Sequence, residues 1–146
     1  MEIFGIQIDS LCDMVCFGVT PVIISYQMGL NSVWGIAIEI LFVLCGVIRL
    51  AYFNVLEELK HTNPETDQAK GYRGLPITTI TIIYPIVYLF HPLVSHETFL
   101  LFLAIMHIVV AFLYVLDFKL KKPGNGVIAA MMVLVTAVMV CILFVE

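Results

Sequence analysis

Residues 33–56 read VWGIAIEILFVLCGVIRLAYFNVL, and this stretch decides the class of fold. It is apolar throughout except for a few side chains, of which only Glu39 and Arg49 are charged. A helix needs roughly 20 apolar residues to cross the hydrocarbon core of a bilayer. The run is too long for a strand, and it lacks the alternation of a membrane barrel. The stretch therefore predicts a membrane-spanning helix.

Four further apolar stretches have a similar length. They cover about residues 4–28, 75–94, 98–117 and 126–145. Short polar connectors separate them, apart from the longer loop 57–74, and a Pro-Gly-Asn-Gly sequence breaks the chain before the last stretch. The pattern predicts an all-α fold: a polytopic membrane helix bundle of about five transmembrane helices, forming a single domain over residues 1–146.

The composition excludes several classes of protein. Of the 146 residues, 62% are hydrophobic and 12% are charged, and the mean hydropathy is +1.07. Soluble domains are about 45–50% apolar and about 25% charged. A soluble enzyme, a disordered chain and a nucleic-acid-binding protein are therefore poor interpretations. Membrane lipids are the expected surroundings, and no nucleic-acid partner is expected.

The basic residues indicate how the helices are oriented. All seven lie in the loop 57–74, in the loop 119–125 or near the end of the second stretch: Arg49, Lys60, Lys70, Arg73, Lys119, Lys121 and Lys122. Two predicted spans separate the two loops, so both loops lie on one side of the membrane. The positive-inside rule assigns that side to the cytoplasm. Met1 is then cytoplasmic and Glu146 lies on the far side.

Two acidic residues within the first stretch are candidates for chemistry, because charges inside a span are costly. Asp9 and Asp13 are four residues apart and share one face of a helix, with Gly5 one turn earlier on that face. A shared divalent cation or a shared proton would relieve their mutual repulsion. Oxygen ligands suit Mg²⁺, Mn²⁺ or Ca²⁺ better than zinc. Gly5 would allow a ligand or a neighbouring helix to approach the backbone.

Arg49 lies about eight residues before the cytoplasmic end of its span, which is roughly 12 Å at the rise of an α-helix. Asp9 and Asp13 lie at a comparable depth, so the sequence predicts a polar pocket in the cytoplasmic half of the membrane. A guanidinium suits bidentate phosphate binding; an ion pair between helices or snorkelling to the interface is the alternative. Arg73, at the mouth of the third stretch, is a weaker candidate, since loop cations beside lipid headgroups are common.

Other polar residues in the spans have simpler interpretations. Glu39 lies in the outer half of its span, away from the pocket, and is interpreted as structural or as part of a dimer contact. His107 is expected to be a packing histidine, and Asn54 a capping or packing residue. The four cysteines all lie in apolar stretches and are expected to be free thiols.

The spacing of Gly5, Asp9 and Asp13 resembles the second half of the signature of the CDP-alcohol phosphatidyltransferase family, D-x2-D-G-x2-A-R-x8-G-x3-D-x3-D. Three blocks in order resemble its phosphatidylserine synthase branch: IDSLCDMVCFGVTP at 8–21, IRLAYFNV at 48–55 and RGLPIT at 73–78. The resemblance covers essentially the whole chain. The departures within it are Cys12, Cys16, Tyr52 and Thr78.

This resemblance implies a membrane-embedded transferase with its active site at the cytoplasmic face. It would transfer a phosphatidyl group from CDP-diacylglycerol to L-serine, giving phosphatidylserine and CMP. Asp9 and Asp13 would bind the divalent metal, Mg²⁺ or Mn²⁺ with Ca²⁺ as an alternative, and Asp13 would also act as general base. Gly5, Arg49 and Arg73 would contact the substrates. The family also implies a homodimer.

Alternatives follow from the first half of the signature, which would precede Met1. The expectation is therefore a domain that is incomplete at its N-terminus, and this chain alone could be inactive with half of its signature absent. A non-catalytic truncated homologue is one alternative, and a phosphatidyltransferase for another alcohol is a second. A small transporter that uses the Asp pair and Arg49 to relay ions or protons is a third, less favoured one. Archaeal-type lipid donors also remain open.

Overall fold

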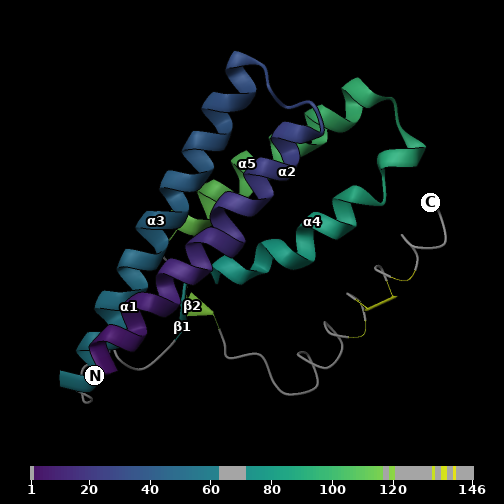
Figure 1. The fold of residues 1–146 in the computed structure, drawn as a ribbon. Helices are drawn as coiled ribbons and strands as arrows, with labels where there is room; N and C mark the ends of the chain where they lie inside the picture. The colour runs from purple at the N-terminus through teal and green to yellow at the C-terminus, as the bar shows by residue number, and fades with distance from the viewer. Residues whose placement is uncertain are drawn as a thin grey trace.

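The structure is a computed structural model, and it describes residues 2–62, 72–116 and 119–120, together with Val133, Thr136, Ala137 and Val140. Figure 1 shows long helices that lie side by side, with the first helix crossing the others at an angle. Three of the described helices are long and apolar enough to cross a membrane: Phe4–Gln27, Val33–Leu59 and His96–Val115. This agrees with the prediction of an integral membrane protein built from helices.

The first spanning helix changes its helical type in the middle. It consists of α1 (Glu2–Asp13), a π-helix η1 (Met14–Val19) and α2 (Thr20–Gln27). Pro21 lacks an N–H group, and in a regular α-helix its ring would crowd the carbonyl four residues earlier. The wider π turn ends where Thr20 donates both its backbone N–H and its hydroxyl to the carbonyl of Val15. Pro21 therefore gives a local reason for the irregular turn, which begins directly after Asp13.

A tight turn connects α2 to α3 (Val33–Thr62). Gly29 has a φ of +114°, which favours glycine, and the N–H groups of Gly29 and Leu30 bond back to carbonyls of α2. The two helices then run antiparallel (Figure 1). α3 extends six residues beyond the predicted end at residue 56, because Glu57, Glu58 and Lys60 are good helix formers.

The third predicted span, 75–94, is interrupted. It contains a 3₁₀ turn η2 (Ile77–Thr79), α4 (Ile80–Tyr88) and a second 3₁₀ turn η3 (His91–Leu93). The apolar helical region Ile77–Leu93 is shorter than the other three spans. Leu75 lies outside the helical region, which begins at Ile77, since a proline disfavours the α conformation of the residue before it. The fifth predicted span, 126–145, lies almost entirely outside the described residues.

α5 (His96–Val115) follows η3, and a small two-stranded sheet closes the other end of the bundle. β1 (Tyr72–Arg73) pairs antiparallel with β2 (Lys119–Leu120), in the register Tyr72–Leu120 and Arg73–Lys119. Sequence reasoning did not predict this sheet. It joins residues 72–73 to residues 119–120, so the described parts of the two loops that the charge pattern placed on one side of the membrane lie together.

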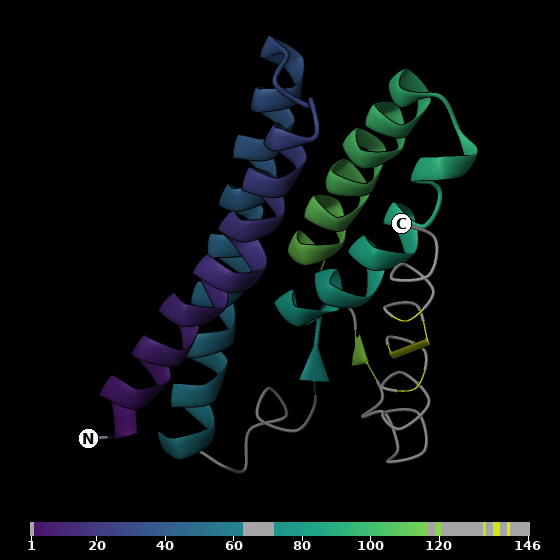
Figure 2. The same ribbon diagram turned by 45° about the vertical axis from the view of Figure 1, so that its right-hand side comes forward.

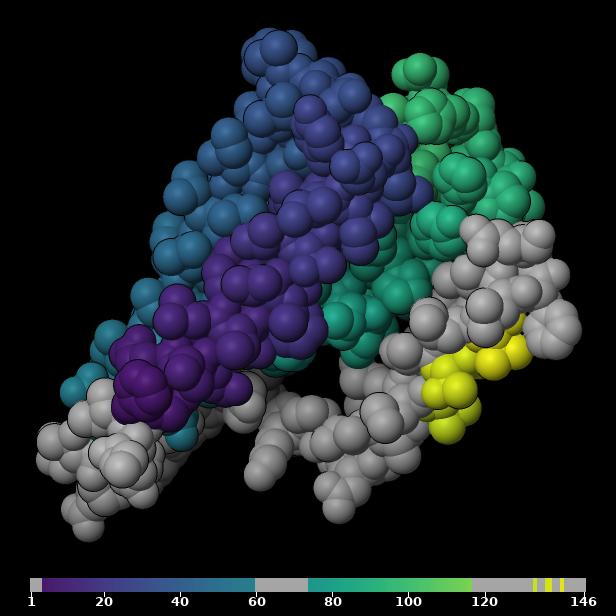
Figure 3. Space-filling view, in the orientation of Figure 1, coloured from purple at the N-terminus to yellow at the C-terminus, as the bar shows by residue number. Residues whose placement is uncertain are grey.

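The core lies between α3, α4 and α5. α3 packs most extensively against α5, and Figure 2 shows α1 to α3 on one side of the bundle and the α4–α5 hairpin on the other. The fully buried side chains include Phe42, Ile80, Phe99 and Leu103. Figure 3 shows the first helix lying along the outside of the bundle. Most apolar residues of the three long helices remain exposed, as expected for surfaces that face lipid.

Candidate functional site

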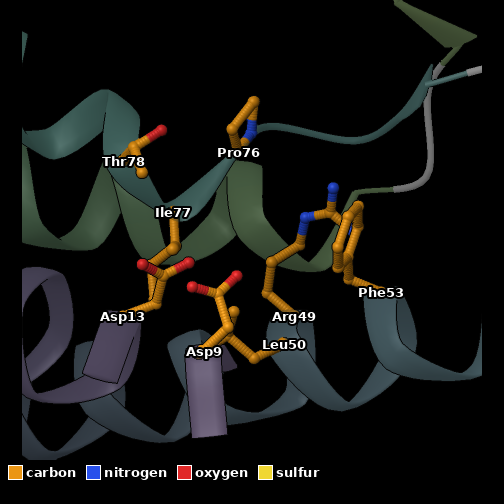
Figure 4. Close-up of a pocket in the computed structure, with 8 residues that line it drawn as sticks. All are labelled: Asp9, Asp13, Arg49, Leu50, Phe53, Pro76, Ile77 and Thr78. Carbon is orange, nitrogen blue, oxygen red and sulfur yellow. The ribbon is translucent and has the colours of Figure 1, made fainter. Parts of the chain in front are cut away.

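The two acidic residues of α1 face the same space. Asp9 is exposed and Asp13 is half-buried, and four residues of helix place them one turn apart. Both line a cavity of about 200 Å³. Figure 4 shows the two carboxylates side by side on one wall of this cavity, below the segment that carries Pro76, Ile77 and Thr78. The predicted pairing of these residues on one face is therefore present in the structure.

Close packing behind Asp13 fixes the first helix against α3. The Met14 side chain lies in a slot between Gly18 and Gly46, and Ile77 closes the slot. A Cβ atom on Gly18 would lie 2.9 Å from the Met14 sulfur, whereas one on Gly46 would make ordinary contacts at 3.4 to 3.6 Å. Gly18 thus leaves the room in which Met14 fills the contact between the helices, directly beside the acidic pair.

A hydrogen bond from Ser10, the residue directly after Asp9, connects the same two helices. The Ser10 hydroxyl donates to the side-chain carbonyl of Asn54 on α3 at 2.6 Å. The Asn54 amide in turn faces the Gln7 side chain at 3.5 Å. The structure therefore confirms the packing role expected for Asn54.

Arg49 forms another wall of the cavity. Its side chain is 4% exposed, and its Nε donates to the backbone carbonyl of Leu75 at 2.7 Å. In Figure 4 the arginine rises from α3 beside the acidic pair toward the chain segment that precedes Pro76. A buried cation needs hydrogen-bond acceptors. Leu75 lies outside the helices, and its carbonyl accepts the bond from Arg49. The remaining lining residues are Leu50 and Phe53 of α3.

The segment from Gly74 to Ile77 is held from two sides. Gly74 has a φ of +69°, and a Cβ atom there would lie 3.3 Å from Cζ of Arg49 and 3.2 Å from the Leu116 carbonyl oxygen. Glycine therefore fits both the backbone conformation and the close approach. On the other side, the buried Tyr114 hydroxyl donates to the carbonyl of Ile77 at 2.9 Å. These contacts fix the roof of the cavity.

A second cavity of about 150 Å³ lies next to Arg49. Its lining is mostly apolar and aromatic: Ile48, Arg49, Tyr52, Gly74, Tyr114, Val115 and Leu116. Arg49 contributes to both cavities. A single buried guanidinium therefore lies between the space lined by the two carboxylates and a space lined by the end of α5.

The structure brings together three of the five predicted site residues. Asp9, Asp13 and Arg49 line one cavity. Gly5 lies outside this lining, exposed and with nothing within 4 Å of the place where a Cβ atom would be. The backbone of Arg73 lies in β1, close to Gly74, and its side chain is outside the described part of the structure.

Sequence reasoning missed the contributions of Gly74, Leu75 and Tyr114. The Leu75 contact is made by a backbone carbonyl, which leaves no trace in the residue type. Gly74 could have been noticed, because glycine directly before a leucine–proline pair often marks a turn. Tyr114 could have been noticed as a tyrosine near the end of a span, where its hydroxyl needs a partner.

The fold and the site together define the class of this protein. The sequence model of the CDP-alcohol phosphatidyltransferase family matches residues 3–143, and the chain belongs to that family. Members of the family generally depend on a divalent metal. No solved structure shows a significant match to the chain.

Three curated proteins illustrate the similarity. A CDP-diacylglycerol–serine O-phosphatidyltransferase of Saccharomyces cerevisiae is 37% identical over 88 residues, which are 60% of this chain and 32% of that protein. The same enzyme of Helicobacter pylori strain J99 is 39% identical over 82 residues, or 55% and 32%. An archaetidylserine synthase of Methanothermobacter thermautotrophicus is 37% identical over 87 residues, or 59% and 34%. The chain thus matches about a third of the length of each relative.

The donor set of the cavity fits part of a divalent-metal site. Two carboxylates one turn apart offer the oxygen ligands that Mg²⁺ and Mn²⁺ prefer. Among the residues that the structure describes, no group of three or more Asp, Glu, His or Cys side chains could hold a metal. Asp9 and Asp13 therefore suit a metal site that takes its remaining ligands from elsewhere, such as the substrate, water or other acidic residues.

Proposed function

We propose that this chain is a membrane domain of a phosphatidyltransferase that transfers a phosphatidyl group from CDP-diacylglycerol to L-serine and releases CMP. The observation that carries the proposal is the cavity in which Asp9, Asp13 and Arg49 meet. Its two acidic residues belong to the spacing G-x3-D-x3-D, in a chain that belongs to the CDP-alcohol phosphatidyltransferase family. The domain is proposed to extend over residues 1–146.

The names of the relatives support serine as the acceptor alcohol. Both the CDP-diacylglycerol–serine enzymes and the archaetidylserine synthase carry serine in their names, whereas the names differ in the lipid. A diacyl donor is favoured because it appears in the names of most of the relatives. An archaeal-type donor and another alcohol acceptor are the alternatives within the same class of reaction.

Asp9 and Asp13 are proposed to hold the divalent metal, Mg²⁺ or Mn²⁺. When bound, such a metal neutralises the negative charge of the pyrophosphate and of the departing nucleotide. Arg49 adds a positive charge at the wall of the cavity and is proposed to contact a phosphate group. Gly5, one turn before Asp9, is proposed to let the substrate approach the helix backbone, and Arg73 to contact a phosphate near the cavity mouth.

Asp13 is proposed as the general base. The serine hydroxyl oxygen attacks the phosphorus that carries the diacylglycerol, the bond from that phosphorus to the CMP oxygen breaks, and the hydroxyl proton passes to the Asp13 carboxylate. A carboxylate within hydrogen-bond reach of the hydroxyl can accept this proton. Positioning and charge stabilisation supply most of the catalysis in transfers of this kind.

The proposed site faces the cytoplasm. The charge pattern supports this side, since the basic loops that meet at β1 and β2 lie next to the segment that roofs the cavity. A homodimer is proposed from the family resemblance.

The decisive experiment is the Asp13→Asn variant of the full-length protein. CMP release from CDP-diacylglycerol and serine should be abolished, while the protein still folds, because the amide cannot accept the proton. Serine should be compared with glycerol 3-phosphate and inositol as acceptors. Near-normal turnover of the variant would overturn the role of Asp13. Serine-independent ion flux through the reconstituted wild-type protein, without CMP release, would instead favour a transporter. A wild-type protein with neither CMP release nor ion flux would favour a non-catalytic homologue.

A further inference from the structure

The half of the bundle away from the proposed active site contains a second group of buried polar side chains. Ser25 of α2 and His107 of α5 are 0% exposed, and Glu39 of α3 is 3% exposed. Tyr84 of α4 joins them through a hydrogen bond to Ser25. Glu39 precedes Arg49 by ten residues on α3, which is about 15 Å at the rise of an α-helix. Each of four helices therefore contributes one polar group to this cluster.

Several contacts show that the four side chains form one cluster. The Tyr84 hydroxyl lies 2.9 Å from the Ser25 hydroxyl. The rings of Tyr84 and His107 have centroids 6.4 Å apart, and Phe42, one turn after Glu39, packs edge-on against His107 at 4.8 Å. Glu39 precedes Phe42 by three residues on α3, so its buried side chain lies on the same helix face that Phe42 presents to His107. We call Ser25, Glu39, Tyr84 and His107 the outer polar cluster.

Two acceptor atoms of the outer polar cluster have no hydrogen-bond partner among the described residues. They are Oε1 of Glu39 and Nε2 of His107, and both atoms are buried. Nδ1 of His107 lies 3.0 Å from the carbonyl of Leu103. A carbonyl can only accept, so Nδ1 carries the hydrogen, and in the neutral ring, which burial favours, Nε2 presents a lone pair. Leaving buried atoms of this kind without a partner destabilises the folded protein.

The neighbouring hydroxyl groups do not bond to these two atoms. The Ser25 and Tyr84 hydroxyls bond to each other at 2.9 Å, and either can be the donor. The Tyr84 hydroxyl also lies 3.8 Å from the sulfur of Met28. Within the described part of the bundle, Oε1 of Glu39 and Nε2 of His107 therefore lack a hydrogen-bond donor, which a proton on Glu39 or a bound molecule would supply.

The apolar surroundings of Glu39 favour its neutral carboxylic acid form. An ionised carboxylate in an apolar bundle is costly without a cation beside it. Arg49 lies ten residues further along α3, and the other members of the outer polar cluster are a serine, a tyrosine and a histidine, whose own charge burial also disfavours. The acid form removes the charge and supplies one donor. It does not by itself bond to His107, because no hydrogen bond joins the two side chains.

We propose that the outer polar cluster is a binding site for an enclosed water molecule that bridges the neutral carboxylic acid of Glu39 and Nε2 of His107. The water accepts the Glu39 proton and donates to the lone pair of the imidazole. Buried waters typically make about three hydrogen bonds to groups that otherwise lack partners. The site ties α3 to α5 in the half of the bundle opposite the proposed catalytic cavity, and it is independent of the proposed reaction.

A double-mutant cycle tests the bridge. The variants Glu39→Leu and His107→Leu should each lower the melting temperature of the purified protein, because each leaves the other polar group without its partner. The double variant should lower it by clearly less than the sum, since both polar groups are then gone. Ser25→Ala and Tyr84→Phe, whose side chains bond directly, give the matched reference cycle. If the losses in melting temperature of Glu39→Leu and His107→Leu simply add in the double variant, the shared site is overturned.

Two further measurements separate water from its alternatives. Glu39→Gln keeps the shape and neutrality of the acid and retains a donor, so it should melt within a few degrees of wild type and release CMP at the wild-type rate. A melting temperature as low as that of Glu39→Leu would indicate an ionised Glu39 with a bound cation. A high-resolution map of the wild-type protein should show density for water between Oε1 and Nε2. A direct contact between these atoms, or a dry gap, would overturn the proposal.

Discussion

Nε of Arg49 donates a hydrogen bond to the carbonyl oxygen of Leu75 at 2.7 Å. The buried cation that lines the proposed active site therefore also holds the chain segment that enters α4. Leu75 precedes Pro76, and the segment continues into the roof of the cavity. Changes to Arg49 should consequently affect the charge in the cavity and the position of its roof together.

The variant Arg49→Lys tests this double role. Lysine keeps the positive charge but lacks the planar guanidinium, so it cannot reproduce the Nε contact together with a phosphate contact. Hydrogen bonds to charged groups contribute about 1.5–3 kcal/mol. The kcat/KM for CDP-diacylglycerol should fall roughly 10- to 100-fold, measured by CMP release from the full-length protein. A variant with wild-type kcat/KM would exclude a role that requires the guanidinium.

The variant Gly74→Ala should destabilise the roof of the cavity. Its Cβ atom would meet both Arg49 and the Leu116 carbonyl, at a φ of +69°. The left-handed conformation alone costs about 1–2 kcal/mol for a residue with a Cβ atom. The melting temperature and CMP release should both fall. Gly46→Ala is the matched control, because its Cβ atom makes ordinary contacts in a helix and alanine is favoured there by about 0.5–1 kcal/mol. Equal effects of the two changes would contradict the assignment.

The variant Tyr114→Phe removes the other support of the roof. The Ile77 carbonyl would lose its hydrogen bond from a buried hydroxyl, at a cost of about 1–3 kcal/mol. A lower melting temperature is expected, together with a higher KM, because the cavity wall formed by Ile77 is less firmly placed. An unchanged KM, despite the loss of stability, would show that Tyr114 serves the fold alone.

The long-range features of the fold follow directly from the sequence, because apolar length and charge position are properties of the residues themselves. The spans around Asp9, Asp13 and Arg49 were predictable, and so was their common depth. The two basic loops could also be placed together, and the pairing of β1 with β2 bears this out.

The details that shape the cavity were less predictable. The contact from Arg49 goes to a backbone carbonyl, and the π turn after Asp13 depends on the N–H group that Pro21 lacks and on the two hydrogen bonds from Thr20 to the Val15 carbonyl. Neither leaves a periodic pattern in the sequence. Likewise, the shared site of Glu39 and His107 needs the relative rotation of α3 and α5. Hydropathy specifies which stretches are helical, whereas packing specifies which of their faces meet.

Asp9 and Asp13 should respond differently to metal. After removal of divalent ions with EDTA, wild-type CMP release should be lost and then restored by Mg²⁺ or Mn²⁺. Loss of an outer-shell partner already weakens metal binding about 10- to 100-fold, so Asp9→Asn should need at least that much more metal for half-maximal activity. Asp13→Asn should stay inactive at every metal concentration, since it also lacks the base. Identical metal curves for Asp9→Asn and wild type would exclude Asp9 as a ligand.

The orientation of the bundle can be tested with two positions at its opposite ends. Ser32 lies in the turn before α3, near the start of α5, because Gly29 lies against His96. α5 then runs 20 residues, or about 30 Å, toward β2 and Lys119. In a background with the native cysteines replaced, Ser32→Cys should react with a membrane-impermeant maleimide in intact cells. Lys119→Cys should react only after permeabilisation, because the basic loops are proposed to be cytoplasmic. The reverse pattern would move the proposed active site to the outer face.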